Sequence, residues 1–478
     1  MANSIVRQQL KYAASDFVTS AAGVFLYNVT RFFLNHDIVS VQGFGSLSSF
    51  LSAPMVVAGQ FIFPVAMMVV YWLSGYYNDV FRRSLLQEFV VTLMSTFVNM
   101  LMIFFVALIN DTVAEHYHNY ELLFVLWGIL FILLYPSRLA ITIGVKRRIA
   151  RSDIEFETLM IGCSDRAFKF VKKISDLKHL LGYKVIGYVN SEGSECNRTD
   201  GMLPVYSMDE LAEACKQHDI SDFIVVPPQG SDAAGLLKIL NMLFPFNKPI
   251  KVLPDEANLL LSRVKLVSMY DEPFIDVSSG NMSNCETNIK RFVDCILSGL
   301  VLLVLSPFFA VLAILIKCMS KGPVIYKQER IGRHGRPFTM YKFRTMRVNA
   351  ECDGKPCLTK DDDERIVPLG KFMRKYRIDE LPQFWNVLKG DMSIVGPRPE
   401  RKYFIDQIVP KAPYYTLLHQ VRPGITSLGM VKYGYAKNVD EMVERLKFDL
   451  LYIENMSLLN DLKIIIYTVK TVITGKGI

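Results

Sequence analysis

The sequence predicts a membrane protein with four N-terminal transmembrane helices, an α/β middle domain and a C-terminal α/β domain anchored by a re-entrant helix-break-helix. Three observations predict it. Hydrophobic residues make up 51% of the 478 residues, which is more than a soluble enzyme needs. The net charge is +8, and the cations gather beside apolar runs. Strand and helix patterns alternate in the middle of the chain.

Residues 1–150 contain the apolar runs, and each is close to the length of about 20 residues that crosses a bilayer. We therefore assign these residues to a four-helix transmembrane domain. The alternative is a set of helices buried inside a large soluble domain. The predicted spans are Phe17–Phe33, Pro54–Leu73, Phe89–Asn110 and Leu122–Ile143.

The loops between these runs predict an orientation. Cations precede the first run, separate the second from the third at Arg82 and Arg83, and follow the fourth from Lys146 onward. The other two loops contain no Lys or Arg. Because cationic loops stay in the cytoplasm, both ends of this block are expected to face inward. We expect the basic charge to serve a membrane surface and expect no nucleic-acid partner.

Residues 151–275 predict a small Rossmann-like α/β domain with a parallel, doubly wound sheet. Its strands are expected in "TLMIGCS", "YKVIGYV", "DFIVVPP" and "IKVLP", with helices near Asp165–Ile174 and Ala233–Leu243. The glycine-rich dinucleotide fingerprint is degenerate, with Gly162, Ser164 and Ala167 at its three positions. This pattern favours a structural or regulatory role over a dinucleotide site. The polar residues 276–289 are expected to be a linker.

The eight cysteines form no CxxC pair. Cys352 and Cys357 are five apart in a polar stretch, without a nearby histidine, so they give only a weak indication of a metal site. Free thiols in a reducing compartment fit this pattern better than zinc or disulfides.

Residues 290–320 hold an apolar run that enters the membrane but is not expected to cross it. Ser306 and Pro307 interrupt the run, and proline breaks a helix because it lacks a donor and clashes with the preceding turn. The next stretch, Lys321–Arg347, holds eight Lys or Arg and one Glu, which is a cytoplasmic signature. A re-entrant helix satisfies both facts, and a fifth transmembrane helix is the alternative.

At such a break the freed carbonyls must be covered by Ser306 or by neighbouring protein. The cations at the mouth of the run, Lys290 and Arg291, are expected beside Asp294 at headgroup level, where they meet anionic lipid or a lipid phosphate. This geometry suits an enzyme with one substrate in water and the other in the bilayer.

Residues 321–478 carry the candidate chemistry. Two carboxylates, Asp379 and Glu380, stand side by side behind cations, and Arg398 lies between two prolines. Arginine forks fit phosphate oxygens, so the clusters predict a pyrophosphate held by cations and Mg²⁺, with one acid free to attack phosphorus. Taken singly, each cluster could be a lipid-binding stripe, a solvated acidic turn or a rigid loop. The other cations include Arg330, Arg333, Arg336, Lys342, Arg344, Arg374 and Arg377.

Together these motifs are specific, and residues 290–478 resemble the bacterial sugar transferase family, the monotopic phosphoglycosyl transferases. The resemblance covers about two-fifths of the chain. The matching motifs are "KRFVD" (Lys290–Asp294), Ser306-Pro307, "GPVIYKQERIGRHGRPF" (Gly322–Phe338), "KFRTM" (Lys342–Met346), "DELPQFWNVLKGDMS" (Asp379–Ser393), "VGPRP" (Val395–Pro399), "RPGIT" (Arg422–Thr426) and "DLLYIENMSLLNDLKI" (Asp449–Ile464).

The resemblance implies transfer of hexose-1-phosphate from a UDP-hexose to undecaprenyl phosphate, with release of UMP. This is the first step of capsule, exopolysaccharide or O-antigen synthesis, at the cytoplasmic face of the bacterial inner membrane. Asp379 would be the nucleophile and Glu380 would help to hold Mg²⁺. Cations would grip phosphates or support the site: Arg374, Arg398, Arg333, Lys342 and Arg344. A homodimer through the middle domain is a further implication.

The chain departs from the family pattern at three places. Arg377 stands where members often have Ser or Thr, Ser427 replaces a common glycine, and "MVKYGYA" (Met430–Ala436) replaces a "QVNGR"-like segment. These departures leave the choice of hexose open. Three alternatives also stay open: a glycosyltransferase that moves only the sugar, a nucleotide-sugar epimerase or reductase using the middle domain, and a membrane scaffold for polysaccharide assembly.

Overall fold

The computed structural model describes residues 2–34, 45–110, 116–176, 182–190, 203–227, 233–246, 248–253, 266–269, 272–276, 282–319, 322–347 and 363–474. The chain divides into two compact units, Met1–Glu155 with Ile174–Lys184, and Phe156–Lys173 with Val185–Ile478. Cys352 and Cys357 lie outside the described residues. Among the cysteines that are described, five are free thiols: Cys163, Cys215, Cys285, Cys295 and Cys318.

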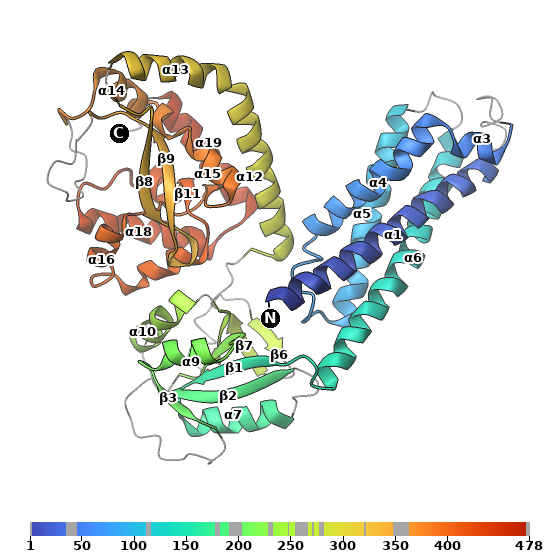
Figure 1. Ribbon diagram of the computed structural model, residues 1–478, viewed down its shortest axis with the longest axis horizontal. Coiled ribbons are helices and arrows are strands. Elements are labelled where there is room, and N and C mark those ends of the chain that lie inside the picture. Colours follow the sequence, from blue (N-terminus) through green and yellow to red (C-terminus); the bar gives the residue numbers. More distant parts are fainter. Residues whose placement is uncertain are drawn as a thin grey trace. The chain divides into compact units, whose positions relative to one another are not determined.

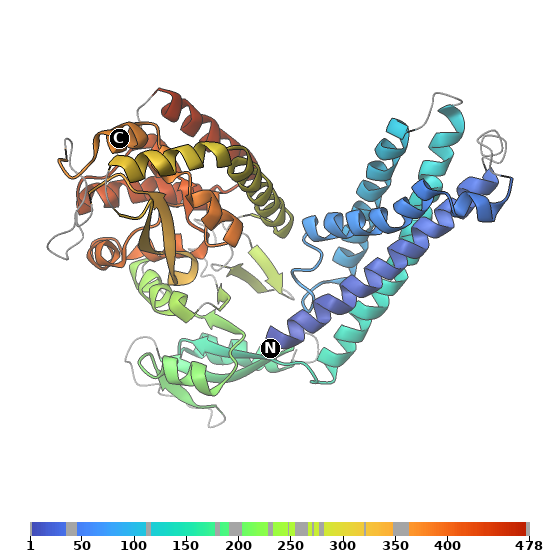
Figure 2. The same ribbon diagram turned by 45° about the horizontal axis from the view of Figure 1, so that its top comes forward.

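The N-terminal unit confirms the four predicted apolar helices. Each of them is long and apolar enough to cross a membrane. Two of them, α1 and α6, run side by side along most of their length (Figure 2). The predicted spans lie inside these helices, although the first helix begins well before Phe17. The helices are α1 (Ala2–Leu34), α4 (Pro54–Leu73), α5 (Leu85–Asn110) and α6 (His116–Ala150), with a short α3 (Leu47–Leu51) before α4.

The polarity of this block argues against helices buried in a soluble domain. Large apolar side chains such as Phe61 and Leu86 point outward and are 67% and 73% exposed. Charged side chains lie inside, and Asp16, Glu88 and Arg138 have no exposed surface. An apolar exterior around a polar interior is the arrangement that a bilayer favours, because lipid solvates the outer face and buried polar groups pair with one another.

The interior charges form a paired network. Arg138 donates through Nε and Nη2 to the two carboxylate oxygens of Asp16, each at 2.8 Å. Arg83 pairs with Glu88 at 3.3 Å, so this loop cation is neutralised inside the block. Tyr76 donates to Glu88 at 2.7 Å. The early part of α1 reaches this network through Tyr12, whose hydroxyl lies 2.8 Å from that of Thr142, and Thr142 donates to Glu88 at 2.9 Å.

The middle of the chain forms a seven-stranded sheet in the order β3-β2-β1-β4-β5-β7-β6. The pairs β2–β3, β1–β4 and β4–β5 are parallel, as predicted for this region. Helix α7 lies on the opposite face of the sheet from α9 and α10 (Figure 1). The elements are β1 (Phe156–Ile161), α7 (Asp165–Asp176), β2 (Tyr183–Asn190), β3 (Val205–Ser207), α9 (Leu211–Gln217), β4 (Asp222–Val225), α10 (Ala233–Leu243), η1 (Phe244–Phe246) and β5 (Ile250–Val252).

Two antiparallel strands extend the sheet beyond the prediction. Strand β7 (Glu272–Asp276) pairs with β5, and β6 (Leu266–Met269) pairs with β7. Near the predicted fingerprint, Gly162 has φ of +120°, and a side chain there would meet the carbonyl oxygen of Val226 at 2.5 Å. The glycine therefore makes room for a neighbouring strand of the same sheet. Asp165 in the first turn of α7 also disfavours an anion at that helix end.

Two consecutive helices follow the sheet. Helix α12 (Asn284–Val304) begins within residues 276–289, which were expected as a linker, and a capping box of Ser283 and Glu286 starts it. Helix α13 (Ser306–Met319) continues after a break at Leu305, and the two axes are bent by 59°. The bend lies one residue before Ser306-Pro307, where the sequence predicts it.

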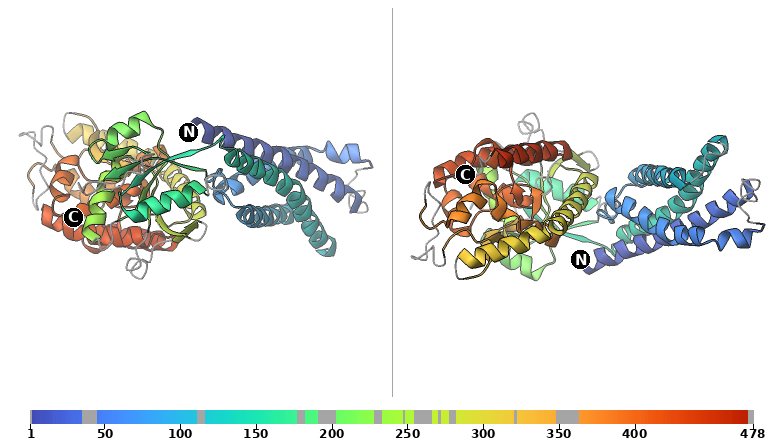
Figure 3. Two further views of the ribbon diagram at one scale, coloured as in Figure 1. Left: turned by 90° about the horizontal axis from the view of Figure 1, so that it is seen from below. Right: turned by 90° about the horizontal axis from the view of Figure 1, so that it is seen from above.

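The C-terminal region combines two small sheets with surrounding helices, and the helices are drawn as orange and red ribbons in Figure 3. Strands β8 (Ile325–Ile331) and β9 (Pro337–Phe343) form an antiparallel hairpin, and β10 (Ser393–Val395) pairs in parallel with β11 (Gly424–Thr426). The remaining elements are η2 (Arg333–Gly335), α14 (Pro368–Lys375), η3 (Ile378–Glu380), α15 (Gln383–Lys389), α16 (Lys402–Ile408), η4 (Pro413–Gln420), α17 (Leu428–Lys432), α18 (Val439–Glu454) and α19 (Leu458–Ile473).

Candidate active site

The carboxylate pair lies in a tight turn between two helices. Helix α14 ends at Lys375, the single turn η3 holds Asp379 and Glu380, and α15 follows from Gln383. Arg377, which precedes the turn, has φ of +54°, a left-handed conformation that is uncommon outside glycine. Backbone strain of this kind concentrates at functional sites, where the surrounding structure enforces it. Both carboxylates are buried, with Asp379 8% and Glu380 4% exposed.

The hairpin brings a lysine to this turn. Asn386 of α15 accepts from the backbone N–H of Tyr341 at 3.1 Å and donates to the carbonyl oxygen of Thr339 at 2.7 Å. These two bonds fix α15 against β9. The next residue on the strand, Lys342, then donates from Nζ to Glu380 Oε1 at 2.7 Å. The lysine that the sequence placed among supporting residues therefore contacts the carboxylate pair directly.

Arg398 reaches the turn from the loop that follows β10. Its Nη1 lies 3.6 Å from Glu380 Oε1. The loop is held by the buried carboxylate of Glu400, which pairs with Arg330 at 3.0 Å and with Arg445 at 2.6 Å. Because Glu400 anchors the loop from two directions, the guanidinium of Arg398 is directed at the carboxylates by a rigid support.

The two adjacent acids have opposite electrostatic behaviour. The pKa of Asp379 is raised to about 6, and burial is the largest cause. The positive charges of Lys342 and Arg374 act to lower this pKa, and the negative charge of Glu380 acts to raise it. For Glu380 burial also acts to raise the pKa, but Lys342, Arg398 and Arg377 together hold its pKa below the usual range. Glu380 is therefore the permanent anion of the pair. Asp379 is the group whose charge is least stabilised by the protein, as expected for a carboxylate that is reactive near neutral pH.

The residues fit a divalent cation. Glu380 Oε2 is buried and accepts no hydrogen bond from the described residues. Within the described stretches no group of three or more His, Cys, Asp or Glu could hold a metal ion. Mg²⁺ is often held by one or two carboxylates together with substrate phosphates. The pair Asp379–Glu380, in which Glu380 Oε2 lacks a hydrogen-bond partner among the described residues, suits such a site.

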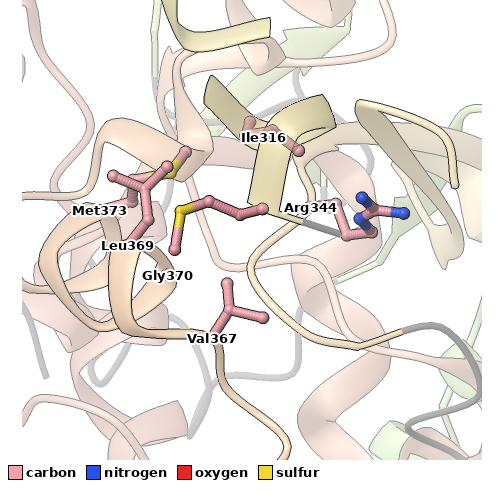
Figure 4. Close-up of a pocket in the computed structure, with 7 residues that line it drawn as sticks. Ile316, Arg344, Val367, Leu369, Gly370 and Met373 are labelled. Carbon is pink, nitrogen blue, oxygen red and sulfur yellow. The ribbon is translucent and has the colours of Figure 1, made fainter. Parts of the chain in front are cut away.

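Two predicted cations, Arg374 and Arg344, are not among the described residues that pair with Glu380. Arg374, in the last turn of α14, donates from Nε to Thr345 Oγ1 at 2.9 Å, and its charge acts on Asp379. Arg344 is buried and lines a small pocket (Figure 4). Asp379 and Glu380 are not among the residues that line this pocket, which are Ile316, Met319, Arg344, Val367, Leu369, Gly370 and Met373.

Arg333 is not brought to the carboxylates. It lies in η2 at the tip of the β8–β9 hairpin and donates to the carbonyl oxygen of Gln420 at 3.1 Å. Lys342 lies toward the other end of β9, and a strand rises about 3.4 Å per residue, so the two cations are separated by most of the strand.

The cations at the mouth of α12 also have partners within the C-terminal region. Lys290 donates to Asp461 and to the carbonyl oxygen of Val395, and Arg291 donates to the carbonyl oxygens of Val387 and Leu388 at the end of α15. Asp294 accepts from Ser393 at 2.6 Å. These residues, expected at a lipid phosphate, fasten α12 to β10 and α15.

At the break, Ser306 Oγ donates to the carbonyl oxygen of Leu303 at 2.8 Å. That carbonyl lies four residues before Pro307 and would accept the backbone N–H that proline lacks. The serine therefore replaces the missing donor, which is why the two residues occur together.

Sequence reasoning listed Arg377 among the cations of the predicted pyrophosphate site without a role of its own, and it gave no role to Tyr435 and Glu400. Arg377 Nη1 lies 3.9 Å from Glu380 Oε2, and the ring of Tyr435 lies against Arg377 and Arg398. Arg377 and the "MVKYGYA" segment stand out in the sequence as departures from the family pattern. The sequence does not show, however, that Arg377 and Tyr435 lie against each other.

Comparison with known proteins identifies the family of the C-terminal region. Residues 285–475 match the family model described as bacterial sugar transferase. A "UDP-glucose:undecaprenyl-phosphate glucose-1-phosphate transferase" of Caulobacter vibrioides is 37% identical over 187 residues, which are 39% of this chain and 70% of the relative. The chain belongs to the bacterial sugar transferase family.

Other members of the family are longer than the matched region. A "UDP-N-acetylgalactosamine-undecaprenyl-phosphate N-acetylgalactosaminephosphotransferase" of Aeromonas hydrophila is 40% identical over 229 residues, 48% of this chain and 53% of the relative. A "UDP-glucose:undecaprenyl-phosphate glucose-1-phosphate transferase" of Escherichia coli K12 is 33% identical over 291 residues, 60% of this chain and 62% of the relative. The chain thus spans about half to three-fifths of the length of these two transferases.

Proposed function

We propose that the protein transfers hexose-1-phosphate from a UDP-hexose to undecaprenyl phosphate and releases UMP. The observation that carries the proposal is the pair Asp379–Glu380, in which Glu380 is neutralised by Lys342 and Arg398 while Asp379 keeps a raised pKa. Four cations face these two acids, so the site carries more positive than negative charge and favours an anionic substrate.

The chemistry proceeds in two displacements at one phosphorus. A carboxylate oxygen of Asp379 attacks the β-phosphorus of the UDP-sugar, and the bond from that phosphorus to the bridging oxygen breaks, so UMP leaves with this oxygen. An oxygen of the lipid phosphate then attacks the same phosphorus and displaces the carboxylate, which regenerates Asp379. Arg398 and Arg374 bind phosphate oxygens, and Lys342 holds Glu380 in place.

Mg²⁺ is proposed as the cofactor, held by Glu380 and by phosphate oxygens of the substrate. When bound, it would offset phosphate charge during the transfer. Its proposed protein ligand is the open Oε2, while Oε1 accepts from Lys342. Removal of divalent cations with EDTA should stop turnover, and added Mg²⁺ should restore it.

We propose that α12 and α13 form a re-entrant helix pair. The start of α12 is bonded to β10 and α15, and α13 packs through Leu312 and Ile316 against Phe343 and Met373 of the same C-terminal region. Both ends of the pair are therefore tied to one domain. Helix α13 has 14 residues, about 21 Å at 1.5 Å per residue, which is short of the bilayer core of about 30 Å. These facts support entry and exit through one leaflet.

The catalytic domain is proposed to lie on the cytoplasmic face of the bacterial inner membrane. The charge distribution of the loops supports this orientation. Helix α19 adds an exposed apolar stripe suited to a membrane surface. Its members are 51–73% exposed and recur every three or four residues: Leu459, Leu462, Ile466, Val469 and Ile473.

The proposed domains are residues 1–150, 151–275, 290–320 and 321–478, with 276–289 between sheet and re-entrant pair. The middle domain is proposed to be Rossmann-like but structural, because its strand order matches nucleotide-binding folds while the space at Gly162 is filled by Val226.

A homodimer is proposed on family resemblance and is tested by the mass of the protein in detergent.

The proposed reaction is tested with a UDP-hexose labelled at the β-phosphorus. Purified protein with undecaprenyl phosphate should move the label into the lipid product and release unlabelled UMP, and a panel of UDP-sugars should identify the hexose. Release of UDP with an unlabelled lipid product would mean that only the sugar moves. Absence of any transfer across the panel would leave the scaffold alternative.

A further inference from the structure

We propose that Arg377 is an additional phosphate-binding residue of this site and that Tyr435 is the positioning residue that holds it. This inference rests on the proposed function. Neither residue belongs to the family motifs found in the chain: Arg377 replaces a common Ser or Thr, and Tyr435 lies in the segment that departs from the family pattern.

Arg377 has an unused donor where a phosphate would bind. Its side chain is 9% exposed, and its Nε is buried without a hydrogen-bond partner among the described residues. Its Nη1 lies 3.9 Å from Glu380 Oε2, which is too long for a hydrogen bond. A buried guanidinium with an unsatisfied donor is costly unless a ligand completes it. The facing Oε2 of Glu380 is an acceptor that also lacks a partner.

Tyr435 contacts both guanidinium groups that face Glu380. The ring centroid lies 5.3 Å from the guanidinium carbon of Arg377 and 4.9 Å from that of Arg398. Both distances are within the range of about 6 Å in which an aromatic face attracts a cation. Neither arginine is within hydrogen-bond distance of Glu380, and Arg398 also donates from Nη1 to Met430 Sδ at 3.0 Å. The ring of Tyr435 is a contact that the two guanidinium groups share.

The backbone explains how the ring reaches the site. Tyr435 follows α17 in a short connection to α18, and Gly434 has φ of +97°, a conformation that other residues rarely adopt. This turn directs Tyr435 toward the arginines. Tyr433, on the other side of Gly434, lies beside Phe448 instead, with ring centroids 6.4 Å apart. Tyr433 is therefore a matched control of similar exposure, 40% against 36%.

The guanidinium groups of Arg377 and Arg398 together form a binding site for a diphosphate. Arg398 and Arg377 approach the two oxygens of Glu380 from separate loops, and the ring between them offsets the repulsion of their charges. With donors left free, the pair can bind oxygens of neighbouring phosphates in the UDP group.

The test measures UDP binding by the full-length protein, using calorimetry in detergent, beside the kinetics of UMP release. Arg377→Gln and Tyr435→Leu should each weaken UDP binding about tenfold, which corresponds to about 1.4 kcal/mol. Tyr435→Phe keeps the aromatic face and should stay within about threefold of wild type. Tyr433→Leu should bind as wild type does. In turnover, KM for the UDP-sugar should rise by more than kcat falls.

A double variant separates positioning from a general structural role. Because Tyr435 acts partly through Arg377, Arg377→Gln with Tyr435→Leu should lose less than the product of the two single losses. Wild-type UDP affinity in Arg377→Gln or Tyr435→Leu would overturn the proposal, as would equal defects in Tyr435→Leu and Tyr435→Phe. If the wild type binds UDP but releases no UMP, the proposed reaction fails while these affinities still decide the roles of Arg377 and Tyr435. No UDP binding by the wild type would overturn both.

Discussion

Two buried charge clusters in this protein differ in how completely their charges are paired. In the helical block, two acids meet two arginines, Asp16 with Arg138 and Glu88 with Arg83, and each carboxylate also accepts from a tyrosine. At the candidate active site, four cations face two acids, and both Glu380 Oε2 and Arg377 Nε lack hydrogen-bond partners among the described residues.

The difference indicates what each cluster does. A buried ion network that satisfies itself fixes the packing of the helices and has no capacity left for a ligand. A buried cluster with excess positive charge and unused donors is stable only because the fold enforces it, and a bound anion would complete it. We therefore propose that the first cluster is structural and that the second binds an anionic substrate, although both contain Arg and carboxylates.

The largest expected effect is the loss of turnover in Asp379→Asn. The amide has nearly the same shape but cannot attack phosphorus, so UMP release should fall at least about 10³-fold, as for removal of other nucleophiles. The control is Asp440→Asn, at an exposed surface acid, which should keep wild-type activity. UMP release from Asp379→Asn at near the wild-type rate would assign the nucleophile elsewhere.

Arg138→Leu should destabilise the helical block by about 3–5 kcal/mol, because it leaves the carboxylate of Asp16 buried without its partner. Thermal unfolding in detergent, followed by the fluorescence of the block's tryptophans, measures the loss. The double variant Asp16→Leu with Arg138→Leu removes both charges and should recover part of the stability. A single variant as stable as wild type would show that the network is dispensable.

Asp379→Asn should also change stability with pH. The folded state raises the pKa of Asp379 to about 6, so the stability that this group contributes is fully present below pH 4 and is lost as the pH rises through about 6. The variant has no such loss. At pH 8 it should be more stable than wild type by on the order of 3 kcal/mol, and near pH 4 the two should unfold alike. Equal unfolding midpoints of the variant and the wild type at pH 8 would mean that burial does not raise the pKa of Asp379.

The smallest effect is expected at the helix break. Ser306→Ala removes the donor to the carbonyl oxygen of Leu303 and should destabilise the protein by about 1 kcal/mol. Ser298→Ala, on the same helix pair, is the matched control because the buried hydroxyl of Ser298 has no hydrogen-bond partner among the described residues. It should be neutral or slightly stabilising, because no hydrogen bond is lost with the buried hydroxyl. Equal effects of the two substitutions would mean that the Ser306 hydroxyl does not replace the missing donor.

Local patterns predicted much of this fold. The lengths of the apolar runs predicted the four helices, proline after serine predicted the bend, and alternating strands and helices predicted the parallel part of the sheet. The antiparallel strands β6 and β7 were not predicted, because short strands at a sheet edge have no distinctive periodicity.

What local patterns could not predict are pairings between distant residues. Asp16 and Arg138 are 122 positions apart; the sequence placed Asp16 just before the first predicted span and Arg138 within the fourth, and it did not show that they pair. Similarly, Lys290 and Arg291 read as surface cations, while the fold gives them carbonyl and carboxylate partners more than 90 positions away. The carboxylate pair was recognisable because its residues are adjacent, whereas Arg377 and Tyr435 meet only in three dimensions.

The most direct test of the account is the mass of the intact protein after incubation with a UDP-hexose in the absence of lipid acceptor. We expect a hexosyl-phosphoryl adduct on the peptide that contains Asp379, its disappearance when undecaprenyl phosphate is added, and no adduct in Asp379→Asn. A wild-type protein that releases UMP with acceptor present yet never carries this mass, under conditions that trap acyl phosphates, would contradict the central claim.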